Sequence, residues 1–260
     1  MLSQSDQKVC YADEKLSTWF EELSLPVAPL CNMMCNYCTK EKDCINNGNN
    51  PAHLSRAMTP RQAVNWAYAS AKRNSRIKTI RISGPGEPLY NSQTFEVLKR
   101  LNSCMPDYIY GISTNGLLLD ELVKELKELN VQKVNVSLNA VSNLALMKLY
   151  SRIIVNNEII VNSEAMATRI IESQFNGMKK CMDSDMSVKV NTIYFPGIND
   201  RELLSVASRC KELGVKSMCL IIFNPRGKFK GLRIPNPTEI AFMREELKKI
   251  IKRVEVKSFV

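Results

Sequence analysis

Short apolar runs alternate with amphipathic stretches along most of the chain. The apolar runs are five to nine residues long and rich in Val, Ile and Leu, which predicts buried strands. Strands are expected at 25–29, 77–83, 108–113, 133–138, 187–195 and 216–223. Helical spacing follows each of them and predicts helices at 61–73, 94–101, 120–129, 163–182, 201–213 and 239–253. Regular alternation of strand and helix is typical of parallel βα units.

Six βα units predict an α/β fold in which parallel strands form a partial (β/α)6 barrel, two units short of the closed eight-unit form. No repeat or linker composition interrupts the chain, so we expect one domain over residues 1–260. Within it, 1–24 is expected to be a helical extension, 25–223 the barrel core, and 224–260 a basic loop with a C-terminal helix. Chemistry in such folds takes place at the carboxyl ends of the strands.

Composition narrows the class of protein. Hydrophobic residues make up 45% of the chain and charged residues 24%, which is typical of a globular domain. No apolar run approaches the roughly 20 residues of a membrane span, and the first residues lack the apolar segment of a signal peptide. We therefore expect a soluble, cytoplasmic protein without a membrane partner.

The net charge of +10 is concentrated in the C-terminal part of the chain. Residues 201–260 hold 14 Lys and Arg against 6 Asp and Glu, and the loop at 225–235 contains four of these cations. Such a loop could meet an anionic substrate or an acidic protein partner, although a solvated loop explains the charge as well. Nucleic acid is a less favoured partner because no series of aromatic residues accompanies the cations.

Cysteine is the residue type that points to chemistry. The chain has nine cysteines and a single histidine, His53, which argues against an imidazole base or a histidine-rich metal site. Cys31, Cys35 and Cys38 form a CxxxCxxC run directly after the first strand. Three thiolates suit three corners of a 4Fe-4S cluster and leave one iron without a protein ligand. A structural zinc site would need a fourth ligand, and Cys44 has no second CxxC to match it.

Polar or glycine-rich segments follow the next strands as well. The second strand ends in Gly84-Pro85-Gly86-Glu87, where glycines let backbone carbonyls approach a ligand and the carboxylate suits a cation. Ser113 and Asn115 end the third strand, Asn139 follows the fourth, and Asn191 begins the segment that turns through 196–200. Taken separately, each is as readily a helix cap or a turn.

With Tyr37 as its aromatic residue, the cysteine run resembles the CxxxCx-aromatic-C signature of the radical S-adenosylmethionine (SAM) superfamily. The resemblance implies that SAM chelates the open iron and is cleaved reductively to a 5′-deoxyadenosyl radical. Residues 84–88 are similar to the family's GGEP motif, and Ile198 to its adenine contact. The SAM contacts implied are Tyr37, Gly84, Gly86, Glu87, Ser113, Asn115, Asn139, Asn191 and Ile198.

Within that superfamily the chain resembles the NifB family, the maturases that build the iron-sulfur precursor of the nitrogenase cofactor. The similar blocks are 25–29, 31–38, 42–44, 84–89, 113–117, 188–191 and 196–200. The resemblance implies an iron-sulfur cluster or small-molecule substrate, a reduced ferredoxin or flavodoxin as electron donor, and Cys10 and Cys44 as accessory cluster ligands. Both cysteines could equally be ordinary buried thiols.

Three departures from that family keep other functions open. The family's His-Pro-Cys block reads Lys8-Val9-Cys10, Gly111 stands where a cysteine is expected, and the sequence ends at Val260, about where the family continues into a CxxC segment. Fewer thiolates should hold substrate clusters less well. The alternatives are a divergent radical SAM enzyme acting on another substrate and a non-enzymatic iron-sulfur carrier or scaffold.

Overall fold

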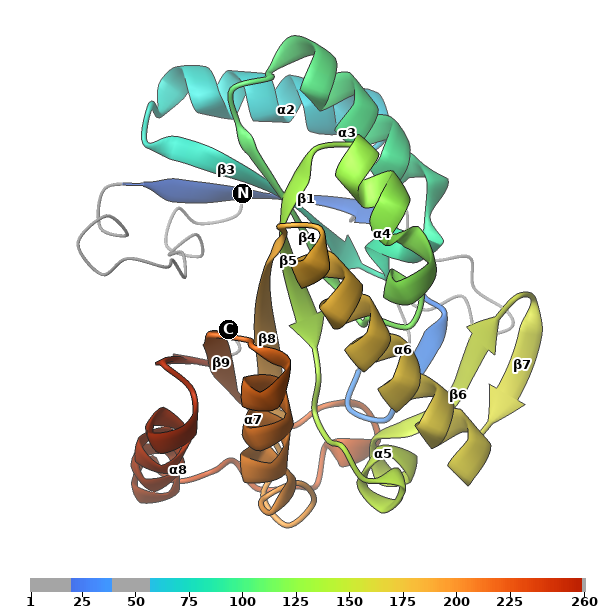
Figure 1. Ribbon diagram of the computed structural model, residues 1–260, viewed down its shortest axis with the longest axis vertical. Coiled ribbons are helices and arrows are strands. Elements are labelled where there is room, and N and C mark those ends of the chain that lie inside the picture. The colour runs from blue at the N-terminus through green and yellow to red at the C-terminus, as the bar shows by residue number, and fades with distance from the viewer. Residues whose placement is uncertain (1–19, 39–56, 259–260) are drawn as a thin grey trace.

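A seven-stranded parallel sheet forms the centre of the computed structural model, which describes residues 20–38 and 57–258 (Figure 1). Its strands lie in the order of the chain: β1 (Glu21–Ala28), β3 (Ile77–Pro85), β4 (Ile109–Thr114), β5 (Val131–Ser137), β8 (Ser187–Tyr194), β9 (Ser217–Ile222) and β10 (Arg253–Ser258). Every neighbouring pair is parallel. Sequential parallel order brings all carboxyl ends to one edge, where a site can form.

The connecting helices are α2 (Pro60–Arg73), α3 (Ser92–Cys104), α4 (Leu119–Glu128), α6 (Glu164–Asp183), α7 (Glu202–Leu213) and α8 (Pro237–Ile250). Their starts follow sequence signals, since Thr59 and Asn236 each form a capping box ahead of a proline. Gly214 ends α7 with φ of 95°. The helices pack on alternate strand residues such as Ile80 and Val134, which are fully buried in the main core.

The other face of the sheet is polar. Alternation along the strands turns Ser24, Ser83, Ser113, Asn135 and Asn191 to the side opposite the core, and each is partly or fully exposed. A parallel sheet normally buries both faces under apolar layers. This sheet instead has a helix-covered outer face and a polar inner face, as expected of a partial barrel with a site inside.

A smaller sheet lies beside the carboxyl edge of the large one. Strand β2 (Met33–Cys35), β6 (Tyr150–Val155) and β7 (Glu158–Val161) are antiparallel and ordered β2-β6-β7. Helix α5 (Asn143–Leu149) precedes β6, and 3-10 turns η2 (Pro88–Tyr90) and η3 (Gly227–Phe229) follow β3 and β9. In Figure 1 the blue chain after β1 runs beside this hairpin. The small sheet thereby anchors the cysteine loop.

The six predicted strands and six predicted helices are confirmed to within a few residues, while three boundaries were wrong. Residues 21–24 belong to β1 rather than to a helical extension, because Ile77 and Thr79 of β3 pair with the acidic start of that strand. The last helix ends at Ile250, not at 253, and β10 adds a seventh strand to the sheet. The core is therefore not confined to 25–223, and α5, β6 and β7 had no predicted counterpart.

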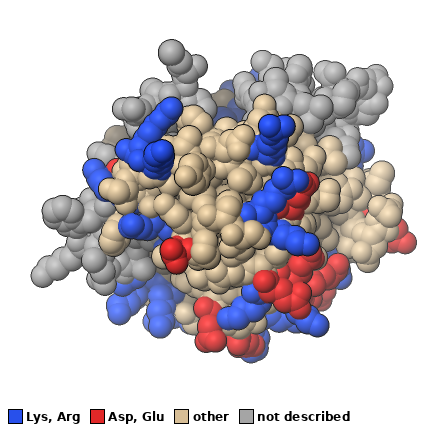
Figure 2. Space-filling view, turned by 90° about the horizontal axis from the view of Figure 1, so that it is seen from above, with Lys and Arg blue, Asp and Glu red and all other residues tan. Residues whose placement is uncertain are grey.

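The described residues contain no helix with the length and apolar character to cross a membrane. On the face seen in Figure 2, Lys and Arg side chains lie in separate groups, and Asp and Glu side chains gather among those at the lower right. The excess positive charge of the chain does not form a continuous stripe on this face.

Candidate metal centre and cofactor site

The three predicted cluster cysteines lie on one loop at the carboxyl end of β1. Cys31, Cys35 and Cys38 are all partly exposed, whereas Cys181, Cys210 and Cys219 are buried. Strand β2 fixes the loop by pairing Cys35 with Tyr150 of β6. In the described ranges, no set of three or more His, Cys, Asp or Glu residues is placed to hold a single metal ion. Soft thiolates on one open loop fit a cluster, whose ligands bind separate irons.

Asn36, between the second and third cysteines, holds the loop to two distant segments. Its side-chain amide donates to the Lys148 carbonyl at 2.7 Å, and its side-chain oxygen accepts from the Ser151 hydroxyl. Its backbone carbonyl accepts from the Lys228 amide at 2.7 Å. Asn36 is buried, so these hydrogen bonds stabilise the loop without competition from water. The cysteine loop is thus a supported element.

Tyr37 is the centre of a buried hydroxyl cluster. Its phenol lies 3.3 Å from the Tyr150 hydroxyl, and the Asn139 amide donates to both, at 2.9 Å and 3.0 Å. Burial is the main cause that raises the pKa of both tyrosines, with the neighbouring Cys35 adding to it. Asn139 also accepts from the Ile193 amide at 2.8 Å. The structure therefore uses Asn139 to join β5 and β8 to the cysteine loop.

Aromatic rings cover the tyrosine cluster. The Tyr37 ring lies 4.8 Å from that of Phe195, and Phe229 lies 5.7 Å from Phe195. Ile198, the predicted adenine contact, is partly buried against the same apolar group, which also includes Phe223. Apolar walls beside a thiolate loop exclude water from it.

The glycine segment after β3 is docked on the cysteine loop. The Gly86 amide donates to the Ala28 carbonyl at 2.6 Å, and the Glu87 amide donates to the Leu30 carbonyl at 2.7 Å. A Cβ at position 86 would lie 2.0 Å from the Leu30 oxygen. Only glycine fits such a close approach of two backbones. Gly84, by contrast, would meet only its own neighbour Gly86.

The Glu87 carboxyl points away from solvent and is 3% exposed. It accepts from the Thr114 hydroxyl at 2.5 Å and from the Asn115 and Leu89 amides at 2.7 Å and 3.1 Å. Burial raises the pKa of Glu87 to about 7, and these three hydrogen bonds oppose the rise. The Glu87 side chain thus links the C-terminal end of β3 to the C-terminal end of β4. Its predicted contact with SAM remains a prediction.

Stability is expected to fall as the pH rises through the titration of Glu87. Since its folded pKa of about 7 exceeds the ordinary carboxyl value of 4.5, the folded protein binds more protons than the unfolded chain between these two pH values. Glu87 contributes about 3 kcal/mol to the free energy of unfolding below pH 4.5, and this contribution is lost as the pH rises to about 7. Denaturant titrations across this range should give a shallower pH dependence for Glu87→Gln. Identical slopes for the two proteins would contradict the assignment.

Asn115 brings the cysteine loop and β4 together. Its side-chain amide donates to the Asn32 side-chain oxygen at 2.9 Å, and its own oxygen accepts from the Leu117 amide. The Asn32 amide nitrogen is buried and has no hydrogen-bond partner in the described structure. An unsatisfied donor costs about 1–3 kcal/mol unless a ligand accepts from it. The position beside Cys31 therefore suits a bound acceptor group.

The remaining predicted contacts lie on the inner face of the sheet. Ser113 and Asn191 are partly exposed there, on β4 and β8. Cys10 and Cys44 lie outside the described residues. The structure thus gathers the contacts into one region but leaves their roles as predictions.

Several residues that build the site had no predicted role. The Asn199 side chain accepts from the Phe195 amide and donates to the Asn139 and Ile193 carbonyls, which fixes the turn after β8. The sequence could have indicated this role, because Asn199 lies in the 196–200 segment that was already assigned to the site. Tyr150 and Phe229 carried none, because they meet Tyr37 only through the tertiary fold.

Residues 25–210 match the family model described as the radical SAM superfamily. The chain is also 33% identical over 242 residues to the FeMo cofactor biosynthesis protein NifB of Methanocaldococcus infernus, covering 92% of this chain and 78% of that one. The chain belongs to the NifB family of radical SAM enzymes. It is 32% identical to the Azotobacter vinelandii protein of the same description, but covers 48% of that longer relative.

Solved structures confirm the radical SAM fold. A radical SAM methyltransferase from Sphaerobacter thermophilus superposes with a TM-score of 0.64 at 19% identity, covering 92% of this chain and 66% of that one. Native anSMEcpe with bound AdoMet gives 0.57 at 15% identity, covering 90% and 63%. Radical SAM enzymes use a 4Fe-4S cluster and SAM, so the predicted cofactors of this radical SAM protein are confirmed at the level of the family.

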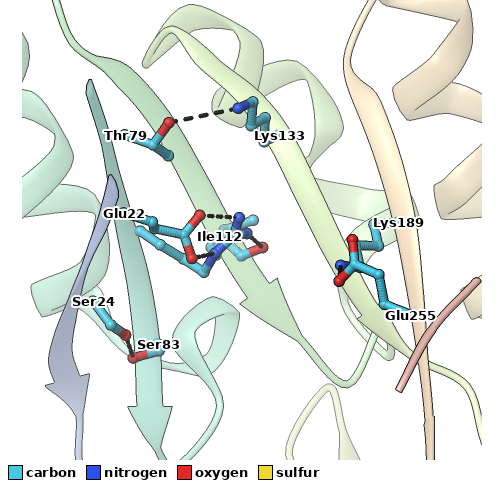
Figure 3. A network of polar contacts seen from close by, with 9 residues as sticks. Glu22, Ser24, Thr79, Ser83, Ile112, Lys133, Lys189 and Glu255 are labelled. Atoms are coloured by element: carbon cyan, nitrogen blue, oxygen red, sulfur yellow. Dashed lines mark hydrogen bonds and ion pairs between the residues drawn. The ribbon is translucent and has the colours of Figure 1, made fainter. Parts of the chain in front are cut away.

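Gly111, the position at which a NifB-type cysteine was expected, lies between Arg81 of β3 and Lys133 of β5 on the inner face. A Cβ there would lie 3.1 Å from an Arg81 nitrogen. The Arg81 guanidinium is buried and makes two hydrogen bonds to Glu22, at 2.6 Å and 2.5 Å. Burial lowers the pKa of Lys133 to about 8. Figure 3 shows Glu22 and Lys133 in this polar network. A guanidinium thus fills the space beside position 111.

Proposed function

We propose that this protein cleaves SAM reductively at a 4Fe-4S cluster bound by Cys31, Cys35 and Cys38, and that it acts in the biosynthesis of the nitrogenase cofactor precursor. The observation that carries the proposal is the loop of three partly exposed cysteines in a chain 33% identical to an archaeal NifB. When bound, the cluster supplies the electron that breaks the sulfonium carbon–sulfur bond of SAM and yields the 5′-deoxyadenosyl radical.

The chain's own residues position and shield the reactants. The backbone at Gly84 and Gly86, the Asn32 amide beside Cys31, and Ser113 and Asn191 of the inner face supply polar groups for the SAM amino acid and ribose. Tyr37 and Ile198 contribute to an apolar wall that suits the adenine and limits the entry of water. Glu87 and Asn139 act as positioning residues, because their polar atoms bind neighbouring strands.

Anaerobic reconstitution with iron and sulfide tests this function directly. Wild-type protein is expected to bind at least about four irons per chain and to release 5′-deoxyadenosine from SAM when dithionite is present. A protein that is fully loaded with its cluster but yields no 5′-deoxyadenosine would refute the enzymatic function and leave the carrier or scaffold alternative.

The partners belong to the same proposal. The substrate is an iron-sulfur cluster or a small molecule that reaches the inner face of the sheet, and the electron donor is a reduced ferredoxin or flavodoxin. Cys10 and Cys44 are proposed as accessory ligands for a cluster substrate. Iron binding beyond one cluster per chain, lost in a Cys10→Ala, Cys44→Ala double variant, would support that part.

The Arg81 arrangement favours a second candidate, a radical SAM enzyme with a different substrate. The buried Arg81–Glu22 pair occupies the inner face where the family resemblance implied a thiolate, so the chain offers no cluster ligand at position 111. A polar substrate would suit the hydroxyl and amide side chains around it. Iron that saturates at one cluster per chain, together with SAM cleavage, would favour this candidate over the precursor synthase.

A further inference from the structure

The segments that support the cysteine loop carry an unusual charge pattern. They are the loop itself (30–38), α5 with β6 (143–155) and the segment after β9 (223–233), and Asn36 hydrogen-bonds to both of the others. These three segments contain no Asp or Glu. Their cations are Lys148, Arg152, Arg226, Lys228, Lys230 and Arg233. Arg233 is paired with Glu239 at 2.5 Å.

The cations lie close to the cysteines. Lys148 and Lys228 are exposed, and each has a backbone atom hydrogen-bonded to Asn36, between Cys35 and Cys38. The Lys228 side chain also reaches the Ser151 hydroxyl at 3.3 Å. Arg152 of β6 lies opposite Met34 of β2 in the register of the small sheet. Positive side chains from two of the three segments therefore lie around one loop.

The segment after β9 is fitted to the loop by shape. Gly227 has φ of 60°, and a Cβ on it would lie 2.5 Å from the Cys38 carbonyl and 2.7 Å from the Asn36 carbonyl. The backbone thus approaches the cysteine loop as closely as glycine permits. Phe229 packs into the aromatic cluster, which holds the exposed Lys228 and Lys230 on either side of it.

We propose that the basic surface formed by the exposed Lys148, Lys228 and Lys230 docks a small acidic electron-transfer protein beside the cluster. The inference rests on the proposed function, which requires one electron for each SAM cleaved. Electron transfer needs close approach, and like charges grouped on one surface steer an oppositely charged partner to it. In the encounter the partner is oxidised by one electron and the cluster is reduced by the same electron, while no bond forms or breaks.

The test compares two charge-reversed variants of the cluster-loaded protein. Lys228→Glu with Lys230→Glu changes the basic surface, and Lys99→Glu with Lys124→Glu makes the same charge change at exposed positions on α3 and α4. The probe is an acidic ferredoxin, whose binding is measured by calorimetry at low and high salt. We expect affinity to fall at least about tenfold in the first variant only, with a weaker salt dependence than in wild type.

Kinetics separates this inference from the proposed function. SAM cleavage driven by the reduced ferredoxin should fall in the Lys228, Lys230 variant, while cleavage driven by dithionite should match wild type. Equal ferredoxin affinity in the two variants would overturn the docking surface, as would binding of single-stranded RNA in place of the ferredoxin. Absence of cleavage with dithionite in wild type would refute the proposed function, and the binding measurement would still decide the docking surface.

Discussion

Replacing Cys35 by alanine is expected to abolish iron-sulfur cluster binding and the release of 5′-deoxyadenosine. A cube held by three thiolates loses a third of its protein ligands. The other described cysteines are not placed to substitute, since Cys181, Cys210 and Cys219 are buried and Cys104 lies at the end of α3. After anaerobic reconstitution, both the iron content and the absorbance of the thiolate-to-iron charge-transfer bands should fall to near background. SAM cleavage should then be undetectable.

Cys104→Ala is the matched control for this change. Cys104 is exposed at the end of α3, so the same loss of a thiol should leave iron content and cleavage at the wild-type level. Circular dichroism should show both variants folded, because Cys35 is only partly buried. Retention of a full cluster by the Cys35 variant would show that the three-cysteine site is wrongly assigned.

Replacing Gly86 by alanine should destabilise the whole carboxyl edge of the sheet. The added methyl group would lie 2.0 Å from the Leu30 oxygen and 2.9 Å from the Ala28 oxygen, and both neighbours are backbone atoms. They cannot rotate away as a side chain would, so β1 and the turn after β3 must separate. The change also breaks the hydrogen bonds of Gly86 to Ala28 and of Glu87 to Leu30. We expect a loss of at least about 3 kcal/mol in the free energy of unfolding.

Gly231→Ala provides the comparison for Gly86→Ala. A Cβ at Gly231 would have no neighbour within 4 Å, so its unfolding free energy should stay within about 0.5 kcal/mol of wild type. Urea unfolding of both variants, followed by circular dichroism, measures the difference. Similar midpoints for the two alanine variants would mean that the close contact of Gly86 with Leu30 does not exist in solution.

The sequence predicted the parts of the fold that depend on local pattern. Period-two and period-3.6 spacing located the strands and helices of the βα units, and Thr59-Pro60 located the start of a helix. Strand β10 was not predicted. Its residues Arg253 to Ser258 alternate charged and apolar side chains directly after a long helix, where a continued helix is the simpler expectation. Helix α5 and the β6–β7 hairpin are short and owe their stability to packing beneath the cysteine loop.

The sequence likewise predicted some features of the candidate site and not others. The cysteines and strand-end motifs are contiguous in sequence, so their spacing revealed them. The inward direction of the Glu87 carboxyl could not be read from its motif, because Thr114 and Asn115, which bind it, come from the next strand. The Arg81 side chain beside Gly111 likewise depends on strand pairing. Such contacts require the register of the sheet, which a single sequence does not supply.

The hydrogen bonds of Asn36 have a consequence for biogenesis. They join the cysteine loop to residues more than a hundred positions later in the chain, the most distant being Lys228. Contacts of such sequence separation form late, because a long stretch of polypeptide must first be ordered. During synthesis the thiols therefore emerge from the ribosome well before their supports exist. Iron delivery is expected to succeed only after translation is almost finished, and premature oxidation of the nascent loop would compete with it.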